Sequence, residues 1–274
     1  SHGKGTRLAS ATDPTAVPGY HRPQRPQPET CGKTRSASTS SMELTVATAT
    51  MSVNLAADVK GAHLSRFIDV LHTWRDQLGA DTALGMADDL RQRMGSTTAR
   101  VHLAFPYFLE RAAPVTGAVA FVDYACALTA TATDEGNDLL LQACVPVTSV
   151  CPCSKAISDR GAHNQRGHIT IEVRPATMDS NLWFDDLIDV AEAAGSSPVY
   201  ALLKRPDERH VTMAGYDNPV FVEDMARAVA QALHRRPQVA AFRVRVVNDE
   251  SIHNHAAYAQ LPWMISHSGE AAHD

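Results

Sequence analysis

The chain has 274 residues, of which 44% are hydrophobic and 20% are charged, and its formal net charge is -5. This length suits one or two domains with a substantial core, and the composition is typical of soluble globular proteins. The negative charge argues against general affinity for nucleic acid or for anionic membranes. No apolar run is long enough to span a bilayer, so we expect neither nucleic acid nor a membrane as a partner.

Five cysteines are present, and no export signal precedes them. The odd number and the missing signal favour free thiols and a cytoplasmic location over a disulfide framework. Cys126 and Cys144 lie in apolar, strand-like runs, where we expect inert core residues. Cys151 and Cys153 flank Pro152 in a polar segment and need a separate explanation.

The first half of the chain begins with a tail and continues with alternating and helical patterns. Residues 1–41 are rich in Pro, Ser, Thr, Arg and Gly, which predicts disorder. A β-prone run over 43–55 predicts a strand. Two amphipathic helices follow, the first opened by Gly61 and the second with Met86 and Leu90 on its buried face. Three candidate strands complete this half, over residues 101–105, 115–130 and 138–150.

The second half repeats this order of elements. A clean alternation from His168 predicts a strand, and helices are expected over 181–194 and from Asn218-Pro219, an N-cap followed by proline. Two further strands are expected, over 239–248 and 256–263. The pattern predicts an α+β fold of two tandem modules, each an antiparallel sheet with paired helices. We place the parts at 1–41 (tail), 42–150 (first module), 151–166 (loop), 167–265 (second module) and 266–274 (tail).

The run from Pro146 to Gly167 is the richest in chemistry. It holds two cysteines, a histidine, a lysine and two arginines between predicted strands. A thiolate and an imidazole together suit zinc, iron or manganese, whereas a thiol beside cations is also how a nucleophilic cysteine is made. His163 stands in a polar, glycine-bounded stretch, which favours a functional loop over a core position.

Three later segments carry further candidates. Residues 202–210 are predicted to be a charged, solvated loop. Glu223 lies in the first turn of a predicted helix, where it either stabilises the helix dipole or accepts hydrogen bonds from the N–H edge of a purine. The pair His253 and His255 ends a strand, and this spacing suits a metal ligand or a plain polar loop about equally.

The basic residues near these segments suit a phosphorylated substrate, and a metal with carboxylates suits hydrolysis. They are Lys155, Arg160, Arg166, Lys204 and Arg205.

Several motifs in one order closely resemble the type IB GTP cyclohydrolase I family. The two that carry most weight are P-V-T-S-V-C-P-C-S-K at 146–155 and G-A-H-N-Q-R at 161–166. Three others are K-G-A-H-L-S-R-F at 60–67, L-K-R-P-D-E at 203–208 and N-P-V-F-V-E-D at 218–224. The resemblance is collinear from about residue 43 to 263. Ala62 departs from it, since we expect threonine there in the family.

The resemblance implies a fold, an assembly and a reaction. The fold is the tunnelling fold, with two modules per chain, assembled as a homotetramer with active sites at subunit interfaces. The reaction converts GTP and water to 7,8-dihydroneopterin triphosphate and formate, the first step of tetrahydrofolate and pterin biosynthesis. It needs one divalent metal per site, Zn, Mn or Fe(II), and no organic cofactor. Metal-activated water would attack C8 of the guanine.

The resemblance also assigns residues to roles. The metal ligands would be Cys151, His163, Glu208 and His253, with Cys151 preferred to Cys153 as the first cysteine of the pair and His255 as the alternative to His253. Glu223 would anchor the purine, and His163 could also shuttle protons if it leaves the metal. The catalytic residues would thus be Cys151, His163 and Glu223. Triphosphate contacts are assigned on charge alone, to Lys155, Arg166, Lys204 and Arg205.

Other readings of the same residues remain open. A related tunnelling-fold nitrile reductase would use the cysteine as a nucleophile with a nicotinamide cofactor. A relative could form a cyclic phosphate from GTP. A purely structural metal module would have a saturated ligand set and no nucleotide site.

Overall fold

The computed structural model describes residues 7–20, 43–57, 61, 63–75 and 78–266. The chain divides into two compact units. One comprises the residues up to Pro106 and the segment Ala127–Leu139, and the other comprises Tyr107–Cys126 and the residues from Leu140 onward. The units interleave segments of the chain, and the predicted module and tail boundaries stay predictions.

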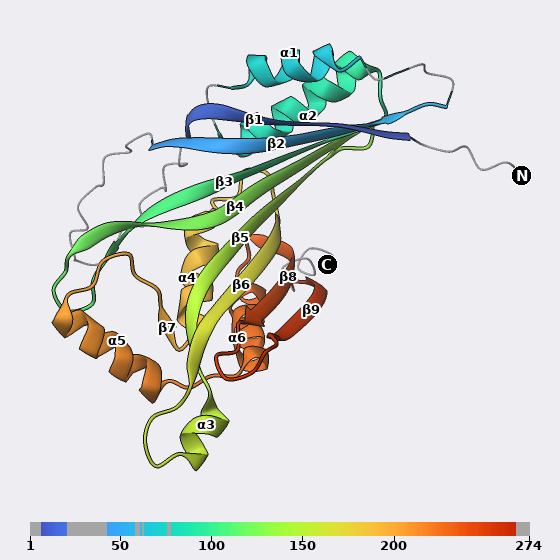
Figure 1. Cartoon of the computed structure of the whole chain (residues 1–274). Helices are drawn as coiled ribbons and strands as arrows, with labels where there is room; N and C mark the ends of the chain where they lie inside the picture. The colour runs from blue at the N-terminus through green and yellow to red at the C-terminus, as the bar shows by residue number, and fades with distance from the viewer. Residues whose placement is uncertain (1–6, 21–42, 58–60, 62, 76–77, 267–274) are drawn as a thin grey trace, which may run out of the picture. The chain divides into compact units, whose positions relative to one another are not determined.

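The first unit is an antiparallel sheet with a helix pair. Its strands follow in the order β1, β2, β3, β4, with bounds Arg7–Tyr20, Glu43–Leu55, Thr98–Ala112 and Val119–Thr133, the last two running on into the other unit. Helices α1 (Ser65–Thr73) and α2 (Ala80–Met94) pack against each other beside β2 (Figure 1). Met51, Phe67, Leu90 and Val101 are buried there. The predicted strand and both predicted helices are confirmed.

Strand β1 differs from the expected disorder of residues 1–41. Arg7–Tyr20 pairs antiparallel with β2, from Arg7 opposite Leu55 to Tyr20 opposite Glu43. The segment contains Pro14 and Pro18, which a strand tolerates at the edge of a sheet, where one side needs no hydrogen bonds. The open edge of β2 thus selects an extended conformation that the local composition does not reveal. The rest of the predicted tail lies outside the described residues.

The second unit contains the other sheet strands and most helices. Its strands follow in the order β5 (Asn137–Val150), β6 (Asn164–Pro175), β8 (Val239–Asn248) and β9 (Ala257–Ile265). A short β7, Ser197–Pro198, also pairs with β5. Helices α4 (Phe184–Ala194) and α6 (Val222–His234) pack side by side, and α6 contacts β8 (Figure 1). The remaining helices are α3 (Pro152–Ile157) and α5 (Arg205–Asp217).

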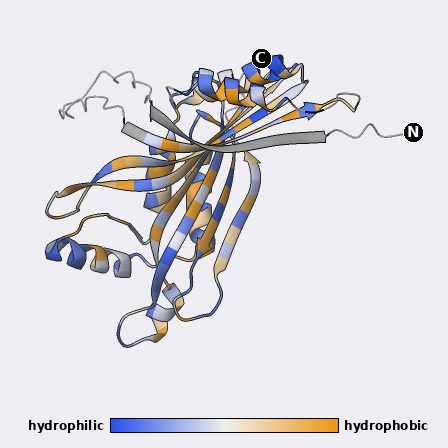
Figure 2. Ribbon diagram, turned by 45° about the horizontal axis from the view of Figure 1, so that its top comes forward, coloured by the Kyte–Doolittle hydropathy of each residue, from blue (hydrophilic) through white to orange (hydrophobic). Residues whose placement is uncertain are grey.

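Alternation along these strands separates a helix-covered face from a polar face. Ile169, Ile171 and Val173 are fully buried, while Thr170 and Glu172 between them are half-exposed. Figure 2 shows the same alternation as orange and blue bands along the strands. The strand predicted from His168 is therefore confirmed, with β6 beginning four residues earlier.

Two expectations near α5 and α6 are wrong. The charged segment 202–210 is no loop, because α5 begins at Arg205. Helix α6 begins at Val222 rather than at Asn218-Pro219, and Asn218 instead ends α5, where its Nδ2 donates to Gly195 O at 3.1 Å. Few apolar residues mark α5, so its hydrophobic period is weak and does not reveal the helix. The Asn218-Pro219 pair therefore predicts the start of the next helix rather than the end of this one.

The cysteine expectations hold in part. Cys126 is buried, and burial raises the pKa of its thiol well above the usual range, whereas Cys144 is only half-buried. Among the described residues, no helix combines the length and apolar character needed to cross a membrane.

Candidate functional site

The end of the β5–β6 hairpin brings Cys151 and His163 together. Val150 pairs with Asn164 at the last rung, and Cys151 N–H donates to His163 O at 3.1 Å. Cys151 is also the N-cap of α3, because Pro152 starts that helix and Cys151 Sγ accepts from Ser154 N–H at 3.4 Å. Ser154 Oγ in turn accepts from His163 N–H at 3.2 Å. The thiol and the imidazole are therefore carried by one tightly hydrogen-bonded turn.

The end of β8 lies beside this turn. Gly167 pairs with Asn248, and Asp249 N–H donates to Arg166 O at 2.9 Å. The carboxylate of Glu250 follows, 3.9 Å from His163 Nδ1. The loop that begins there carries His253 and His255, which are exposed and have stacked rings 5.2 Å apart.

The start of α6 is fixed to the same strand end. Val220 N–H donates to Val150 O at 3.1 Å, and Ser149 Oγ donates to Val220 O at 3.3 Å. Glu223 follows three residues later, exposed in the first turn of α6. The predicted purine anchor thus belongs to a segment tied directly to the residue before Cys151.

The start of α5 is held elsewhere in this unit by a buried carboxylate. Asp207 is fully buried and accepts hydrogen bonds from Val115 N–H at 2.9 Å, Thr116 N–H at 2.9 Å, Thr116 Oγ at 2.7 Å and Lys204 N–H at 3.0 Å. Burial raises the pKa of Asp207, but these four hydrogen bonds outweigh it and hold the pKa well below its usual range. The exposed Lys204, Arg205 and Glu208 are therefore anchored at the 115–116 turn.

The far end of α5 reaches α3. Lys155 Nζ donates to Tyr216 O at 2.5 Å and lies 4.3 Å from the centroid of the Tyr216 ring. Glu208 precedes Tyr216 by eight residues, which is roughly 12 Å along a helix axis. Within one protomer α5 thus holds Glu208 away from the end that meets α3. Accordingly, the described part of the chain contains no group of three or more His, Cys, Asp or Glu placed to hold a metal ion.

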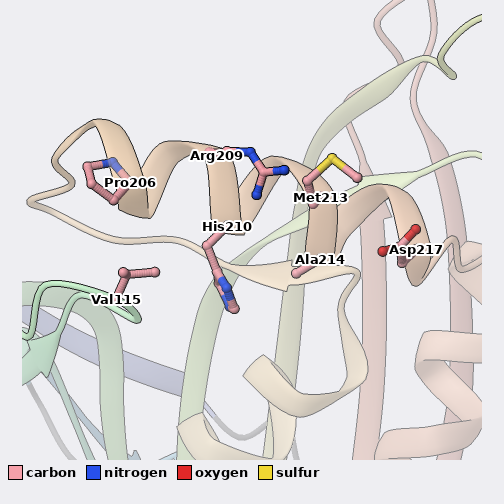
Figure 3. A pocket seen from close by; sticks show the side chains of 7 residues that line it. All are labelled: Val115, Pro206, Arg209, His210, Met213, Ala214 and Asp217. Carbon is pink, nitrogen blue, oxygen red and sulfur yellow. The ribbon is translucent and has the colours of Figure 1, made fainter.

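A groove of about 430 Å³ runs along α5. Figure 3 shows His210 projecting from α5 on the side on which Val115 lies. The other lining residues are Pro206, Arg209, Met213, Ala214 and Asp217. It includes none of the predicted site residues, so we place the chemistry at the Cys151–His163 turn and not in this groove.

The donor set at the turn fits a divalent metal in part. Cys151 supplies a sulfur that the hydrogen bond from Ser154 N–H holds in place. His163 Nδ1 lies 2.9 Å from Gln165 Oε1, so its other ring nitrogen is the one open to a ligand. Two neighbouring donors of the right type are therefore present, and neither Glu208 nor His253 completes a group of three with them among the described residues of one protomer.

Four polar residues beside the turn escaped the sequence analysis. They are Ser149, Gln165, Asn248 and Glu250, of which the first three are buried. Their signal was weak, because Ser149 and Asn248 lie at the ends of apolar strands and Gln165 follows the more conspicuous histidine. The sequence pattern that indicates them is a polar residue at a strand position that should face the core, next to a candidate ligand.

A family model described as type I GTP cyclohydrolase folE2 matches residues 33–259. The chain belongs to this FolE2 family. The FolE2 protein of Desulfovibrio desulfuricans is 45% identical over 222 residues, covering 81% of this chain and 84% of the relative. That of Methylococcus capsulatus is 43% identical over 249 residues, covering 91% and 88%.

Solved structures support the fold of this FolE2 chain. The crystal structure of a uricase from Bacillus fastidious superposes with a TM-score of 0.53 at 9% identity, covering 97% of this chain and 95% of that one. At so low an identity the likeness concerns the fold alone. The α+β tunnelling fold, with antiparallel strands and paired helices, is confirmed.

The anchoring of α5 by Asp207 predicts a pH-dependent loss of stability in Asp207→Asn. The depressed pKa of Asp207 stabilises the folded chain above the unfolded carboxyl pKa of about 3.9, and this stabilisation is lost as the pH falls below it. We expect the midpoint of thermal unfolding to fall by roughly 4–8 °C near pH 7, with the difference shrinking below about pH 4.

Thermal unfolding of metal-free protein followed from pH 3 to pH 7 measures this difference. Asp217→Asn, an exposed carboxylate at the other end of α5, is the matched control and should change the midpoint little. A loss in Asp207→Asn that is equally large at pH 3 and pH 7 would contradict the assignment.

Proposed function

We propose that this chain is a GTP cyclohydrolase that converts GTP and water to 7,8-dihydroneopterin triphosphate and formate, at the entry to folate and pterin biosynthesis, in the cytoplasm. The observation that carries the proposal is membership of the FolE2 family over residues 33–259, which include the whole Cys151–His163 turn. The curated relatives that this chain matches over most of their length bear the name GTP cyclohydrolase FolE2.

A divalent metal, Zn, Mn or Fe(II), is part of the proposal. Cys151, His163, Glu208 and His253 would hold it. When bound, such an ion supplies a Lewis acid that lowers the pKa of water toward neutrality. The hydrogen bonds from Ser154 to the sulfur and between His163 and Gln165 hold two of these ligands in place beforehand.

Glu223 would orient the base. A carboxylate accepts at two oxygens, which matches the guanine N1–H and the 2-amino group. Its exposed position in the first turn of α6 leaves both oxygens accessible. Because Val220 is hydrogen-bonded to Val150, the guanine would be held close to the Cys151 turn.

A homotetramer with interfacial active sites would explain why one protomer leaves the ligand set incomplete. We propose that Glu208 reaches the Cys151 turn of a neighbouring copy, together with Lys204 and Arg205 as triphosphate contacts. Arg166 and Lys155 would contribute from the turn itself, since the Lys155 ammonium keeps two further N–H donors after bonding Tyr216. Large exposed apolar side chains on β9, namely Tyr258, Trp263, Met264 and Ile265, support association.

The direct test is an anaerobic GTP assay with metal-stripped protein repleted separately with Mn²⁺, Zn²⁺ and Fe²⁺. We expect metal-dependent release of formate and of a product that oxidises to a fluorescent pterin. Cys151→Ala should lose bound metal and at least about 100-fold in kcat, because a ligand is removed, and His163→Ala, Glu208→Ala and His253→Ala should behave alike. Cys153→Ala, two residues away and exposed, is the control and should keep activity.

Failure of folded, metal-loaded protein to release either product would overturn the cyclohydrolase proposal. Equal inactivation by Cys151→Ala and Cys153→Ala would remove the ligand assignment instead.

The purine-anchor role predicts that Glu223→Ala retains metal but loses GTP. We expect GTP affinity to fall by roughly 10- to 100-fold, since two hydrogen bonds to a charged acceptor disappear. Isothermal titration with GTP and metal analysis measure the two properties separately. Asp224→Ala, the adjacent exposed carboxylate, should bind GTP as the unaltered protein does, and an unchanged affinity in Glu223→Ala would refute the role.

The interfacial site predicts complementation between two inactive variants. Cys151→Ala and Glu208→Ala, co-expressed with different tags and purified through both, should regain about a quarter of the normal activity, because random pairing reunites an intact turn with an intact α5 at that frequency. Each variant alone should stay inactive. Mixed oligomers without activity, made from folded parents, would place both residues in one protomer's site.

A further inference from the structure

A chain of buried polar side chains lies directly behind His163. Gln165 Oε1 is 2.9 Å from His163 Nδ1, and Gln165 Nε2 is 3.3 Å from Ser149 Oγ. Asn248 Nδ2 reaches the same Ser149 Oγ at 3.0 Å. Ser149, Gln165 and Asn248 retain exposed fractions of only 1%, 8% and 3%, so the two hydrogen bonds among them are made out of contact with bulk water.

The hydroxyl of Ser149 determines the direction of every bond in this chain. A hydroxyl has one proton and two acceptor lone pairs. The proton is directed to Val220 O at 3.3 Å, so the contacts to Gln165 and Asn248 are ones in which Ser149 Oγ accepts from their amide groups. Donor and acceptor capacity of the hydroxyl are then fully used.

This direction determines which ring nitrogen of His163 faces a hydrogen-bond acceptor. Because the NH₂ group of Gln165 faces Ser149, its carbonyl oxygen faces His163 and can only accept. A hydrogen bond to that oxygen therefore requires the proton on His163 Nδ1, and Nε2 is the ring nitrogen that faces away from it. A metal ion binds an imidazole through the lone pair of its unprotonated ring nitrogen.

Two groups approach Nδ1, and distance selects between them. Glu250 lies at 3.9 Å, beyond hydrogen-bond range, while Gln165 lies at 2.9 Å. His163 Nδ1 is therefore hydrogen-bonded to the amide of Gln165 and not to the carboxylate of Glu250.

Gly167 leaves space for the far end of the chain. A Cβ at this position would lie 2.6 Å from Asn248 Oδ1 and 3.2 Å from Val147 Cγ2. A side chain at this position would therefore displace the amide group of Asn248. The glycine fits Asn248 against β6 in the orientation that presents its amide to Ser149.

We propose that Gln165, oriented by Ser149 and Asn248, is a positioning residue that selects the Nδ1–H tautomer of His163 and so presents Nε2 to the metal. The same hydroxyl ties this histidine through Val220 to the segment that carries Glu223, so ligand and purine anchor share one rigid support. This inference rests on the proposed function for the identity of what His163 binds, but the tautomer itself is a property of the metal-free chain.

The first test reads the tautomer directly. Two-dimensional ¹⁵N–¹H spectra of metal-free protein with ¹⁵N-labelled histidine distinguish Nδ1–H from Nε2–H rings, and the His163 signal is identified by its disappearance in His163→Gln. We expect Nδ1–H in the unaltered protein and a mixture of tautomers in Gln165→Leu. An Nε2–H ring in the unaltered protein, or an unchanged Nδ1–H ring in Gln165→Leu, would overturn the proposal.

The second test measures Zn²⁺ affinity by competition with a chromogenic chelator. Gln165→Leu should weaken binding by roughly 10- to 100-fold, and Ser149→Ala, which does not touch His163, should weaken it by a smaller factor because the amide of Gln165 is then free to turn. Asn164→Ala, the exposed neighbour of Gln165, should stay within about twofold, as expected for a residue outside this network. Thermal unfolding checks that each variant is folded.

The outcomes separate the two proposals. The unaltered protein could bind no metal and turn over no GTP, and still show the Nδ1–H ring that is lost in Gln165→Leu. This result would refute the proposed function and support the positioning role. If the unaltered protein is active and both Gln165→Leu and Ser149→Ala keep full Zn²⁺ affinity, the positioning role is refuted and the proposed function is supported. If Gln165→Leu does not fold, the His163 tautomer and the Zn²⁺ affinity of Ser149→Ala decide whether the positioning role stands.

Discussion

The antiparallel pairing of β5 with β6, and of β6 with β8, is the constraint on which the candidate site depends. It sets Val150 opposite Asn164 and Gly167 opposite Asn248, so three strand ends meet at one edge. Backbone hydrogen bonds then carry the turn of Cys151 and His163 and the start of the 249–256 loop. A shift of one residue in the β5–β6 pairing would put Ser149 and Gln165 on opposite faces of the sheet, and such a shift in the β6–β8 pairing would do the same to Gln165 and Asn248.

The buried polar side chains at this edge of the sheet reduce its stability, and they are expected to have a function. Ser149 and Asn248 occupy positions where neighbouring strand residues are apolar, and each unpaired polar atom there would be destabilising. Asn248 Oδ1 does lack a partner among the described residues. Such a departure from a fully apolar core is expected where a side chain must be held in one orientation for chemistry.

The sequence predicts those features of the fold and the site whose signals lie within a short stretch of the chain. Alternation over 43–55 and from His168 identifies strands, because burial on one face imposes a period of two on the residues themselves. The proximity of Cys151 and His163 is predictable because they share one short segment. The start of α5 was missed although Lys204, Pro206 and Asp207 resemble a helix N-terminus, because its apolar stripe is weak.

Contacts between distant segments explain the remaining misses. The link from Ser149 to Val220 joins residues 71 positions apart, and that from Asn248 to Ser149 joins residues 99 apart. No pattern within a short window encodes either. The same holds for β1, whose extended form depends on the edge of β2, and for Glu208, whose relation to Cys151 depends on the arrangement of α5 and not on its sequence motif.

Helix α5 is attached at both ends, by Asp207 to the 115–116 turn and by Tyr216 to Lys155. Adding or removing one residue between these attachments would shift one end by about 1.5 Å and rotate it by about 100° relative to the other. The helix therefore has a fixed length. Insertions and deletions in this region should be better tolerated at Ala201 and Leu202 before the helix, which are exposed.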